Sequence, residues 1–307
     1  MKREKYKPNK LAQEYADKNQ SYWEKRAFSY SELNQHQLSH AQNLVWKAFI
    51  DQNIQQHFKH DKNLKRSAIK VLDIGTGPGF LAIILAQLGY HVTAVDYTLN
   101  MLEEAKSNAG LFRDKIEFFQ MNAEELSFPD ESFDVIVSRK LTWNLLRPVL
   151  AYEQWTRVLK TGGLLLNFDA NWYHYLFDAK AQEARLIDRE HVRMSGVEDD
   201  TAGTDTQTME ALAKKAPLSQ RKRPEWDLAV LSHMGLRVSA DTQIYKQLWT
   251  MDEWINNAST PLFVIKAQKT SCTAKTSISC FVDASYSTIS SAPGDSAFND
   301  KRGGLLA

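Results

Sequence analysis

Short apolar runs alternate with amphipathic segments through the middle of the chain. β-Branched and other apolar residues gather in short runs that predict strands over residues 69–74, 91–95, 116–121, 133–138 and 163–168. Apolar residues at helical spacing predict helices over residues 80–88, 99–109 and 148–159. Strands that alternate with helices in this way indicate an α/β fold, with helices on both faces of a parallel sheet.

The segments that flank this regular region follow other patterns. Residues 1–65 are polar with spaced apolar positions, and they predict an N-terminal helical cap. Residues 171–223 break the alternation and predict a helical insertion after the fifth strand, which we interpret as a substrate lid. A helix over 227–234 and strands over 236–248 and 262–267 complete the pattern. We therefore expect a doubly wound, mostly parallel sheet of seven strands.

The end of the chain has a different composition. From residue 269 onwards Ser, Thr, Ala and Gly dominate without periodicity, which predicts a disordered tail over 269–307. Residues 66–268 then form the main domain. The two cysteines, Cys272 and Cys280, both lie in this tail. The domain therefore offers neither a disulfide framework nor a cysteine-rich metal site, and we predict no metal.

The overall charge does not point to a charged partner. The 307 residues include 38 Lys and Arg against 37 Asp and Glu, a net charge of +1, so we expect no nucleic-acid partner. The longest apolar run, Phe80 to Ala86, falls far short of the roughly 20 residues that span a membrane. The basic N-terminus lacks the apolar stretch of a secretory signal. We expect a soluble cytoplasmic protein without a membrane partner.

A glycine-rich turn follows the first predicted strand. It reads VLDIGTGPGF over residues 71–80 and contains Gly75, Gly77 and Gly79. Glycine lets the backbone approach a ligand that a Cβ would block, and this end of the first strand borders the crevice of a doubly wound sheet. Asp96 ends the second strand about 20 residues later, where a carboxylate can accept ribose hydroxyls. These features indicate a cofactor that contains adenosine.

The spacing of the glycines favours a cofactor without phosphates. Dinucleotide turns read G-x-G-x-x-G, and their third glycine opens the helix under the pyrophosphate. Here position 80 is Phe, and Pro78 has no N–H to offer a diphosphate. An NAD(P)-dependent Rossmann oxidoreductase is therefore the weaker alternative. A non-catalytic cofactor-binding protein of the same fold is a further alternative.

Three motifs in order resemble class I S-adenosylmethionine-dependent methyltransferases that act on small molecules. They are VLDIGTGPG together with Val95-Asp96, the acidic segment NAEELSFPDESFDVIV over 122–137, and LKTGG over 159–163. The resemblance implies the Rossmann-like methyltransferase fold. It also implies S-adenosyl-L-methionine as cofactor, in-line methyl transfer to a small-molecule acceptor, and S-adenosylhomocysteine as product.

The resemblance assigns cofactor contacts by position. Gly75 and Gly77 would pass under the methionine part, and Asp73 would hold its amino end unless it only caps the turn. Asp96 would bind the ribose, with Tyr97 beside the adenine. The whole implied set is Asp73, Gly75, Thr76, Gly77, Gly79, Asp96, Tyr97, Asn122, Ala123, Ser138, Arg139 and Tyr30.

The remaining assignments rest on the end of the fourth strand and on the N-terminal segment. Ser138, Arg139 and Lys140 would line the opening for methyl transfer, although Arg139 and Lys140 also suit an ordinary charged loop. Tyr30, with Tyr22 and Trp23, resembles the N-terminal aromatic segment that covers the cofactor in many such enzymes. The alternative is that these rings only pack the N-terminal helix onto the domain.

The acceptor side is predicted from position alone. Tyr173 and His174 follow the fifth strand at the same rim as the glycine turn, and they are candidate catalytic bases. His174 could equally be a hydrogen-bonded structural residue. The basic run 221–223 could bind an anionic substrate or form a solvated loop. The segment after the fourth strand lacks the Asn/Asp-Pro-Pro-Tyr motif of nucleic-acid amino-methyltransferases. The acceptor's identity and the oligomeric state do not follow from the sequence.

Overall fold

The computed structural model describes residues 10–61 and 63–271 of the chain. A seven-stranded sheet with the order β3-β2-β1-β4-β5-β7-β6 forms its centre. The strands are β1 (Lys70–Ile74), β2 (His91–Asp96), β3 (Ile116–Gln120), β4 (Phe133–Arg139), β5 (Leu159–Asp169), β6 (Leu236–Asp241) and β7 (Phe263–Lys269). Only the pairs that β7 makes with β5 and β6 are antiparallel. This confirms the expected α/β fold with a doubly wound, mostly parallel sheet.

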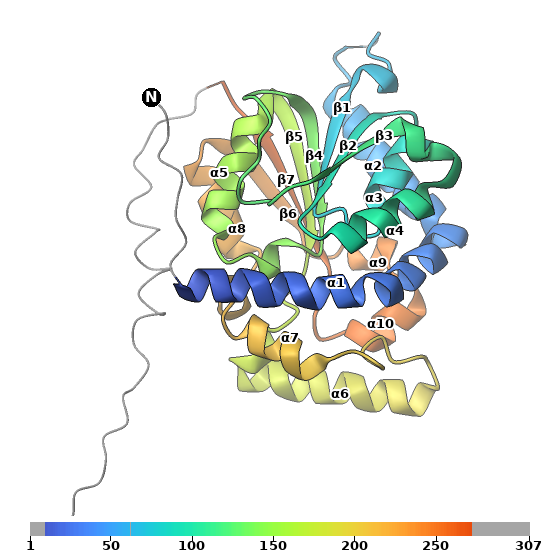
Figure 1. Cartoon of the computed structure of the whole chain (residues 1–307), viewed down its shortest axis with the longest axis vertical. Coiled ribbons are helices and arrows are strands. Elements are labelled where there is room, and N and C mark those ends of the chain that lie inside the picture. Colours follow the sequence, from blue (N-terminus) through green and yellow to red (C-terminus); the bar gives the residue numbers. More distant parts are fainter. Residues whose placement is uncertain (1–9, 62, 272–307) are drawn as a thin grey trace, which may run out of the picture. The chain divides into compact units, whose positions relative to one another are not determined.

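Helices cover both faces of the sheet (Figure 1). One face packs against α2 (Ala41–His57), α3 (Phe80–Gln87) and α4 (Leu99–Ala109). The other face packs against α5 (Pro148–Val158) and α8 (Glu225–His233). Short 3-10 turns η1 (Arg66–Ala68), η2 (Gly110–Lys115) and η3 (Thr142–Asn144) join these elements.

The core explains why the strands and α3 read as continuous apolar runs. Every residue of α3 from Phe80 to Ala86 is buried, and α2 adds the fully buried Trp46 and Ile50. Strand residues Val71 and Val135 belong to the same cluster. Because both faces of a parallel sheet are covered, burial removes the alternation that a half-exposed strand would show.

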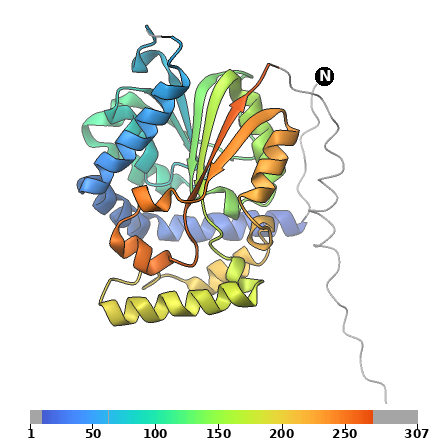
Figure 2. The same cartoon turned by 180° about the vertical axis from the view of Figure 1, so that it is seen from behind.

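The long helix α1 (Lys10–Ser39) lies across the carboxyl ends of the parallel strands (Figures 1 and 2). Glu24 fixes it to the start of α4, because its two carboxylate oxygens accept from the backbone N–H groups of Leu99 and Asn100 at 2.9 Å each. A carboxylate at a helix N-terminus satisfies unpaired donors and interacts favourably with the helix dipole. The predicted N-terminal cap is therefore helical, as α1 and α2.

The insertion after β5 contains η4 (His174–Leu176), α6 (Ala179–Ser195), α7 (Thr206–Ala213) and η5 (Pro217–Gln220). In both views α6 and α7 lie on the side of α1 that faces away from the sheet (Figures 1 and 2). The expected charged helix is present as α6. The structure adds α7, which the Gly- and Thr-rich composition of its surroundings did not indicate.

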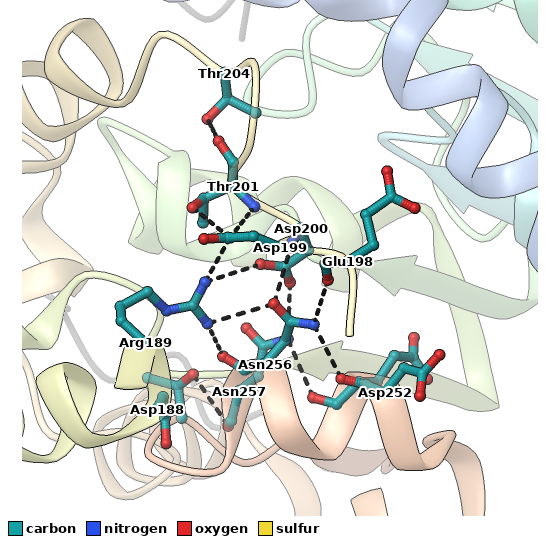
Figure 3. A network of polar contacts seen from close by, with 12 residues as sticks. Asp188, Arg189, Glu198, Asp199, Asp200, Thr201, Thr204, Asp252, Asn256 and Asn257 are labelled. Atoms are coloured by element: carbon teal, nitrogen blue, oxygen red, sulfur yellow. Dashed lines mark hydrogen bonds and ion pairs between the residues drawn. The ribbon is translucent and has the colours of Figure 1, made fainter. Parts of the chain in front are cut away.

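A polar network joins this insertion to α10 (Met251–Asn257), as Figure 3 shows. Arg189 of α6 donates to Asp199 at 2.6 Å and to the backbone oxygen of Asn256. The Asn256 side chain in turn donates to the Glu198 backbone oxygen at 2.9 Å. Side-chain hydrogen bonds from α6 and α10 therefore hold residues 198–200, which follow α6.

Two predicted strands differ from the observed ones. The strand expected over 236–248 ends at Asp241, whose side chain accepts from the Gln243 backbone N–H at 2.8 Å, and α9 (Tyr245–Leu248) follows. This local bond turns the chain and competes with the sheet. Strand β5 begins at Leu159 rather than 163, because the LKTGG segment continues the strand across an irregularity in the pairing with β4.

The expected tail over 269–307 and its Cys272 and Cys280 lie, from residue 272 on, outside the described residues. Before that point, Lys269 ends β7, and its ammonium donates to the Leu159 backbone oxygen at 2.8 Å. Within residues 10–61 and 63–271, no helix has both the length and the apolar character that a membrane crossing requires.

Candidate functional site

A cavity of about 390 Å³ lies where α1 crosses the carboxyl ends of β1, β2 and β4. The glycine turn, the ends of β2 and β4, and the loop after β3 line one side, and α1 lines the other. Of the predicted cofactor contacts, the lining includes Tyr30, Gly75, Gly77, Asp96, Tyr97, Asn122, Ala123 and Arg139. The structure thus brings residues from five separate segments to one cavity.

The glycine turn uses its glycines in different ways. Gly75 has φ +69°, and a Cβ there would lie 2.6 Å from Leu141, so the turn packs directly on the segment after β4. Gly77 has φ +52°, and the nearest atom to a Cβ would be Cε1 of Tyr30 at 3.8 Å. Because Gly77 also lines the cavity, its missing side chain leaves room at the cavity wall.

Asp96 presents a fixed carboxylate to the cavity. Its Oδ2 accepts from the Gly77 backbone N–H at 2.9 Å, and its Oδ1 accepts from the Thr98 backbone N–H at 2.9 Å and from the Thr98 hydroxyl. Burial raises the pKa of Asp96. A carboxylate offers about four lone-pair sites, so these three bonds leave acceptor capacity for a ligand hydroxyl.

Asp73 is hydrogen-bonded to the glycine turn and to α3, and it does not line the cavity. Its Oδ2 accepts from the Thr76 hydroxyl at 2.7 Å and from the Ala82 backbone N–H at 3.0 Å. Burial raises the pKa of Asp73 to about 7. The geometry therefore favours the capping alternative for Asp73 over direct contact with a ligand.

Three other predicted contacts also lie behind the cavity wall. Thr76 is bonded to Asp73 and buried. Gly79 precedes α3, and a Cβ on it would lie 3.1 Å from the Cβ of Ala105 in α4. The Ser138 hydroxyl donates to the Ile74 backbone oxygen at 2.9 Å and is fully buried. In the structure these residues shape the backbone around the cavity rather than border it.

Asn122 and Ala123 border the cavity from the loop after β3. The Asn122 side-chain oxygen accepts from the Glu124 backbone N–H at 2.9 Å, which leaves its second lone pair for a ligand donor. Beside them, the Glu124 carboxylate accepts from both the backbone N–H and the Nε of Arg147 at 2.7 Å. This buried ion pair was not predicted, because its partners are 23 residues apart along the chain.

Arg139 ends β4 at the cavity. Its guanidinium donates to Oε1 of Gln37 at 3.0 Å and lies 4.1 Å from the ring centre of Phe80 and 4.9 Å from that of Trp46. Burial lowers the pKa of Arg139, and its Nε has no hydrogen-bond partner among the described residues. Within the same residues, no carboxylate lies within 4.0 Å of this cation.

Lys140 follows with a left-handed backbone, φ +56°. Its backbone N–H donates to the Phe168 oxygen at 2.8 Å, and its backbone oxygen accepts from Nε1 of Trp143 at 3.0 Å. The ammonium lies 5.2 Å from the ring centre of Trp172. A left-handed backbone is unfavourable for a lysine, so the surrounding contacts hold this residue in place.

The candidate catalytic bases do not reach the cavity. Tyr173 packs against Trp143 with ring centres 4.7 Å apart, and burial raises its pKa. Nδ1 of His174 lies 3.2 Å from the Ser219 backbone oxygen. Neither residue lines the cavity, and neither does any other residue of the insertion.

The insertion instead supports the cavity wall from behind. Met209, Leu212, Ala213 and Ala216 form a buried cluster with Tyr15 of α1 and Trp143 of η3. Tyr15 is itself a lining residue, and its hydroxyl is 2.9 Å from the Asn144 backbone oxygen, to which it donates. The role of the insertion as a substrate lid stays a prediction.

Arg223 fits neither of the two alternatives for the basic run. Its side chain is fully buried and donates to Asp169 at 2.7 Å and to both oxygens of Asp227 at 2.8 and 2.9 Å. It also donates to the Thr142 hydroxyl at 2.6 Å. It therefore joins the end of the insertion to β5 and η3, and it meets neither solvent nor the cavity.

Most of the residues that α1 contributes to the cavity were not predicted from the sequence. The unpredicted lining residues of this helix are Ala12, Gln13, Tyr15, Ala16, Asn19, Gln20 and Trp23, of which only Trp23 had been noted. They recur at helical spacing and so share one face of α1. That face mixes alanines and polar side chains with the aromatic Tyr15 and Trp23, so a search for hydrophobic periodicity does not detect it.

The similarity to known proteins centres on the glycine turn and the strands that follow it. Residues 72–167 match a protein-family model described as a methyltransferase domain. An uncharacterized methyltransferase of Bacillus subtilis, YcgJ, is 34% identical over 143 residues, which cover 44% of this chain and 54% of that protein. The ubiquinone/menaquinone biosynthesis C-methyltransferase of a Bradyrhizobium species is 38% identical over 101 residues, covering 31% and 40% of the two chains.

A solved structure extends over more of the chain. The crystal structure of the YcgJ protein superposes with a TM-score of 0.45 at 22% sequence identity, covering 71% of this chain and 97% of that one. In sequence, the chain spans about half the length or less of the curated relatives it matches, for example 50% and 39%.

Proposed function

From the class I methyltransferase domain that this chain contains, we propose that the protein transfers a methyl group from S-adenosylmethionine to a small-molecule acceptor. One observation carries the proposal. Within the matched region, the glycine turn and the carboxylate of Asp96 border the same cavity, and a bond of 2.9 Å joins Asp96 to Gly77. The expected cytoplasmic location stays a prediction.

The residues at the cavity fit the parts of S-adenosylmethionine. Asp96 has acceptor capacity for the ribose hydroxyls, and Tyr97 with Asn122 flanks the place of the adenine. Gly77 leaves space at the wall for the methionine part. Arg139 also lines the cavity, and its guanidinium suits the methionine carboxylate, since charge-assisted bonds to carboxylates are among the strongest.

The proposed mechanism is mainly one of alignment. When bound, S-adenosylmethionine supplies a methyl group made electrophilic by its sulfonium. The contact between Gly75 and Leu141 fixes the glycine turn relative to the end of β4, where the acceptor has to approach. Helix α1 covers the cavity and limits the entry of water. Holding two reactants in line is worth a large part of a reaction barrier, about 7–11 kcal/mol in favourable cases.

Calorimetry tests the cofactor. We expect S-adenosylmethionine and S-adenosylhomocysteine to bind, and NAD and NADP not to bind. Asp96→Ala should weaken S-adenosylhomocysteine binding by about 1.5–3 kcal/mol, the range for losing hydrogen bonds to a charged group. Glu103→Ala on the exposed side of α4 is the control, which should leave the affinity unchanged. Unchanged affinity in a folded Asp96→Ala protein would exclude this ribose site.

Methyl transfer itself requires a second measurement. Labelled S-adenosylmethionine incubated with the protein and a small-molecule cell extract should yield labelled small molecules and S-adenosylhomocysteine. The Asp96→Ala protein serves as the background. Tight cofactor binding without any labelled product or S-adenosylhomocysteine would favour the non-catalytic alternative.

A further inference from the structure

Gln37, near the end of α1, joins the guanidinium of Arg139 to a carboxylate on another helix. Oε1 of Gln37 accepts from Nη2 of Arg139 at 3.0 Å. Nε2 of Gln37 donates to Oε1 of Glu253 in α10 at 2.8 Å. An amide that meets a cation on one side and a carboxylate on the other has one orientation that satisfies both. The Gln37 side chain is therefore fixed at both of its polar atoms.

Glu253 is itself held in place. Its Oε2 accepts from the Thr250 backbone N–H at 3.0 Å, and its own backbone N–H donates to the Thr250 hydroxyl at 3.2 Å, which completes a capping box at the start of α10. The same Oε2 accepts from Nε2 of the buried Gln42 in α2, which also donates to the Leu248 backbone oxygen at 2.9 Å. Bonds within α10 and from α2 thus fix this carboxylate.

The guanidinium of Arg139 keeps a donor for a ligand. Nη2 bonds to Gln37, and Nε is enclosed without a hydrogen-bond partner among the described residues. Nη1 makes no hydrogen bond within residues 10–61 and 63–271 either, but it is not enclosed as Nε is. Because Arg139 lines the cavity, Nη1 is the nitrogen that a ligand can reach.

An amide between Arg139 and Glu253 differs in effect from a direct ion pair. Arg66 shows the direct case, because its Nε and Nη2 each donate to an oxygen of Asp51 at 2.7 Å and are thereby occupied. Burial lowers the pKa of Arg139, and the charge of Glu253 acts in the opposite direction. The amide thus holds the guanidinium near a supporting charge while the cation stays available.

We infer that Gln37, fixed by Glu253, is a positioning residue that holds the Arg139 guanidinium where it binds the methionine carboxylate of S-adenosylmethionine. This inference rests on the proposed function, which requires the cofactor but not this contact. Neither Gln37 nor Glu253 lines the cavity, so both act through Arg139. Their influence should therefore appear only with ligands that carry the carboxylate.

S-adenosylhomocysteine and its decarboxylated analogue are matched probes, because they differ only in the carboxylate. Calorimetry on the wild type should show S-adenosylhomocysteine binding about tenfold or more tightly than the analogue. Gln37→Met keeps the length of the side chain but none of its hydrogen bonds. It should weaken S-adenosylhomocysteine about fivefold or more and change the affinity of the analogue by less than about twofold.

A double-mutant cycle shows whether Gln37 acts through the guanidinium. Arg139→Met should remove the preference for S-adenosylhomocysteine over the analogue. Gln37→Met added to Arg139→Met should then change either affinity by less than about twofold, because the group that Gln37 positions is already absent. A further loss of S-adenosylhomocysteine affinity in the double variant would contradict the inference.

Two further variants complete the test. Gln37→Glu places a carboxylate against Arg139 that competes with the carboxylate of the ligand, so the preference should fall about fivefold or more. Gln52 is exposed on α2, and Gln52→Met should leave both affinities unchanged. Thermal denaturation establishes that each variant is folded.

The outcomes separate the two proposals. If S-adenosylhomocysteine binds and the decarboxylated analogue binds equally well, the inference is wrong and the proposed function stands. Equal weakening of both ligands by Gln37→Met would show that Gln37 only supports the fold, and unchanged affinities would show that Arg139 needs no such support. Either result overturns the inference alone. If S-adenosylhomocysteine itself does not bind, both proposals fall together.

Discussion

Glycines that share a left-handed backbone conformation, with positive φ, serve different purposes in this protein. Gly77 and Gly89 both have positive φ, +52° and +87°, and neither would bring a Cβ within 3.4 Å of another residue. Only Gly77 lines the cavity. Substitutions at these two glycines therefore separate the stability lost to backbone strain from the affinity lost when a side chain enters the cavity.

We expect Gly77→Ala and Gly89→Ala to lower the free energy of unfolding by a similar amount, about 1–2 kcal/mol each. Only Gly77→Ala should also weaken S-adenosylhomocysteine binding, by tenfold or more, because its methyl group enters the cavity. Chemical denaturation and calorimetry measure the two effects. Equal loss of affinity in both variants would show that strain, and not the shape of the wall, controls binding.

The buried Asp73 should make stability depend on pH. Its pKa is about 7 in the folded protein against an ordinary value near 3.8, so the folded state holds the proton more tightly. The contribution of the Asp73 carboxyl to the free energy of unfolding is therefore largest at low pH, and it is lost as the pH rises from about 4 through 7. Between pH 5 and pH 8 the fall should be of the order of 1–3 kcal/mol.

Asp73→Asn tests this expectation, because asparagine cannot ionise but can still accept from Thr76 and Ala82. Denaturation of the variant at pH 5 and pH 8 should show a smaller loss of stability than the wild type shows over the same interval. Identical pH profiles would mean that the Asp73 carboxyl ionises normally in the folded protein.

Some residues of the site can be predicted from a short stretch of sequence, and others cannot. Gly75, Gly77 and Asp96 could be predicted because a short motif fixes them at strand ends. Asp73 and Ser138 belong to the same motifs, but their side chains bond to the backbone behind the wall. Which side of a strand end faces a cavity depends on the neighbouring strands, and a single sequence does not contain that information.

At the scale of elements, hydrophobic patterning located the strands, and it failed where polar contacts decide the structure. Most residues of β1, β2 and β4 are buried, and each strand has a short apolar run that makes it recognisable in the sequence. The strand end at Asp241 depends on one side-chain bond. The placement of α1 on α4 depends on Glu24, and a single acidic residue leaves no periodic apolar signal.

Arg223 joins β5 and α8 through two buried ion pairs. It pairs with Asp169 of β5 and Asp227 of α8 in a region without solvent, so its removal leaves two buried carboxylates unpaired. We expect Arg223→Met to lower the free energy of unfolding by about 3–5 kcal/mol. The neighbouring Lys222 has a side chain that is 83% exposed, and Lys222→Met should change stability by less than about 0.5 kcal/mol.

Denaturant titration of these two variants provides the measurement. A loss in Arg223→Met no larger than that in Lys222→Met would contradict the network. Because Arg223 also bonds to Thr142, the folded fraction of Arg223→Met should bind S-adenosylhomocysteine more weakly, since η3 leads to the lining residue Asn144.

At the scale of the whole molecule, the cavity exists only because α1 crosses the sheet. Tyr15 bonds to Asn144, Asn19 accepts from Asn144 at 2.9 Å, and Glu24 holds the start of α4. Apart from the apolar cluster around Tyr15, these contacts are polar, so α1 should open more readily than the core strands. A ligand in the cavity touches both sides and should couple α1 to the sheet.

Hydrogen exchange measures that coupling. At a ligand concentration 100 times Kd, binding raises the free energy of any opening that destroys the site by about 2.7 kcal/mol. With S-adenosylhomocysteine present, backbone amides of α1 between residues 12 and 30 should therefore exchange roughly a hundredfold more slowly. Amides of α6 should not, because none of its residues lines the cavity. Saturating ligand with unchanged exchange in α1 would show that the helix opens without destroying the site. In that case the proposed exclusion of water by α1 would fail, while the contacts proposed for Asp96 and Arg139 would stand.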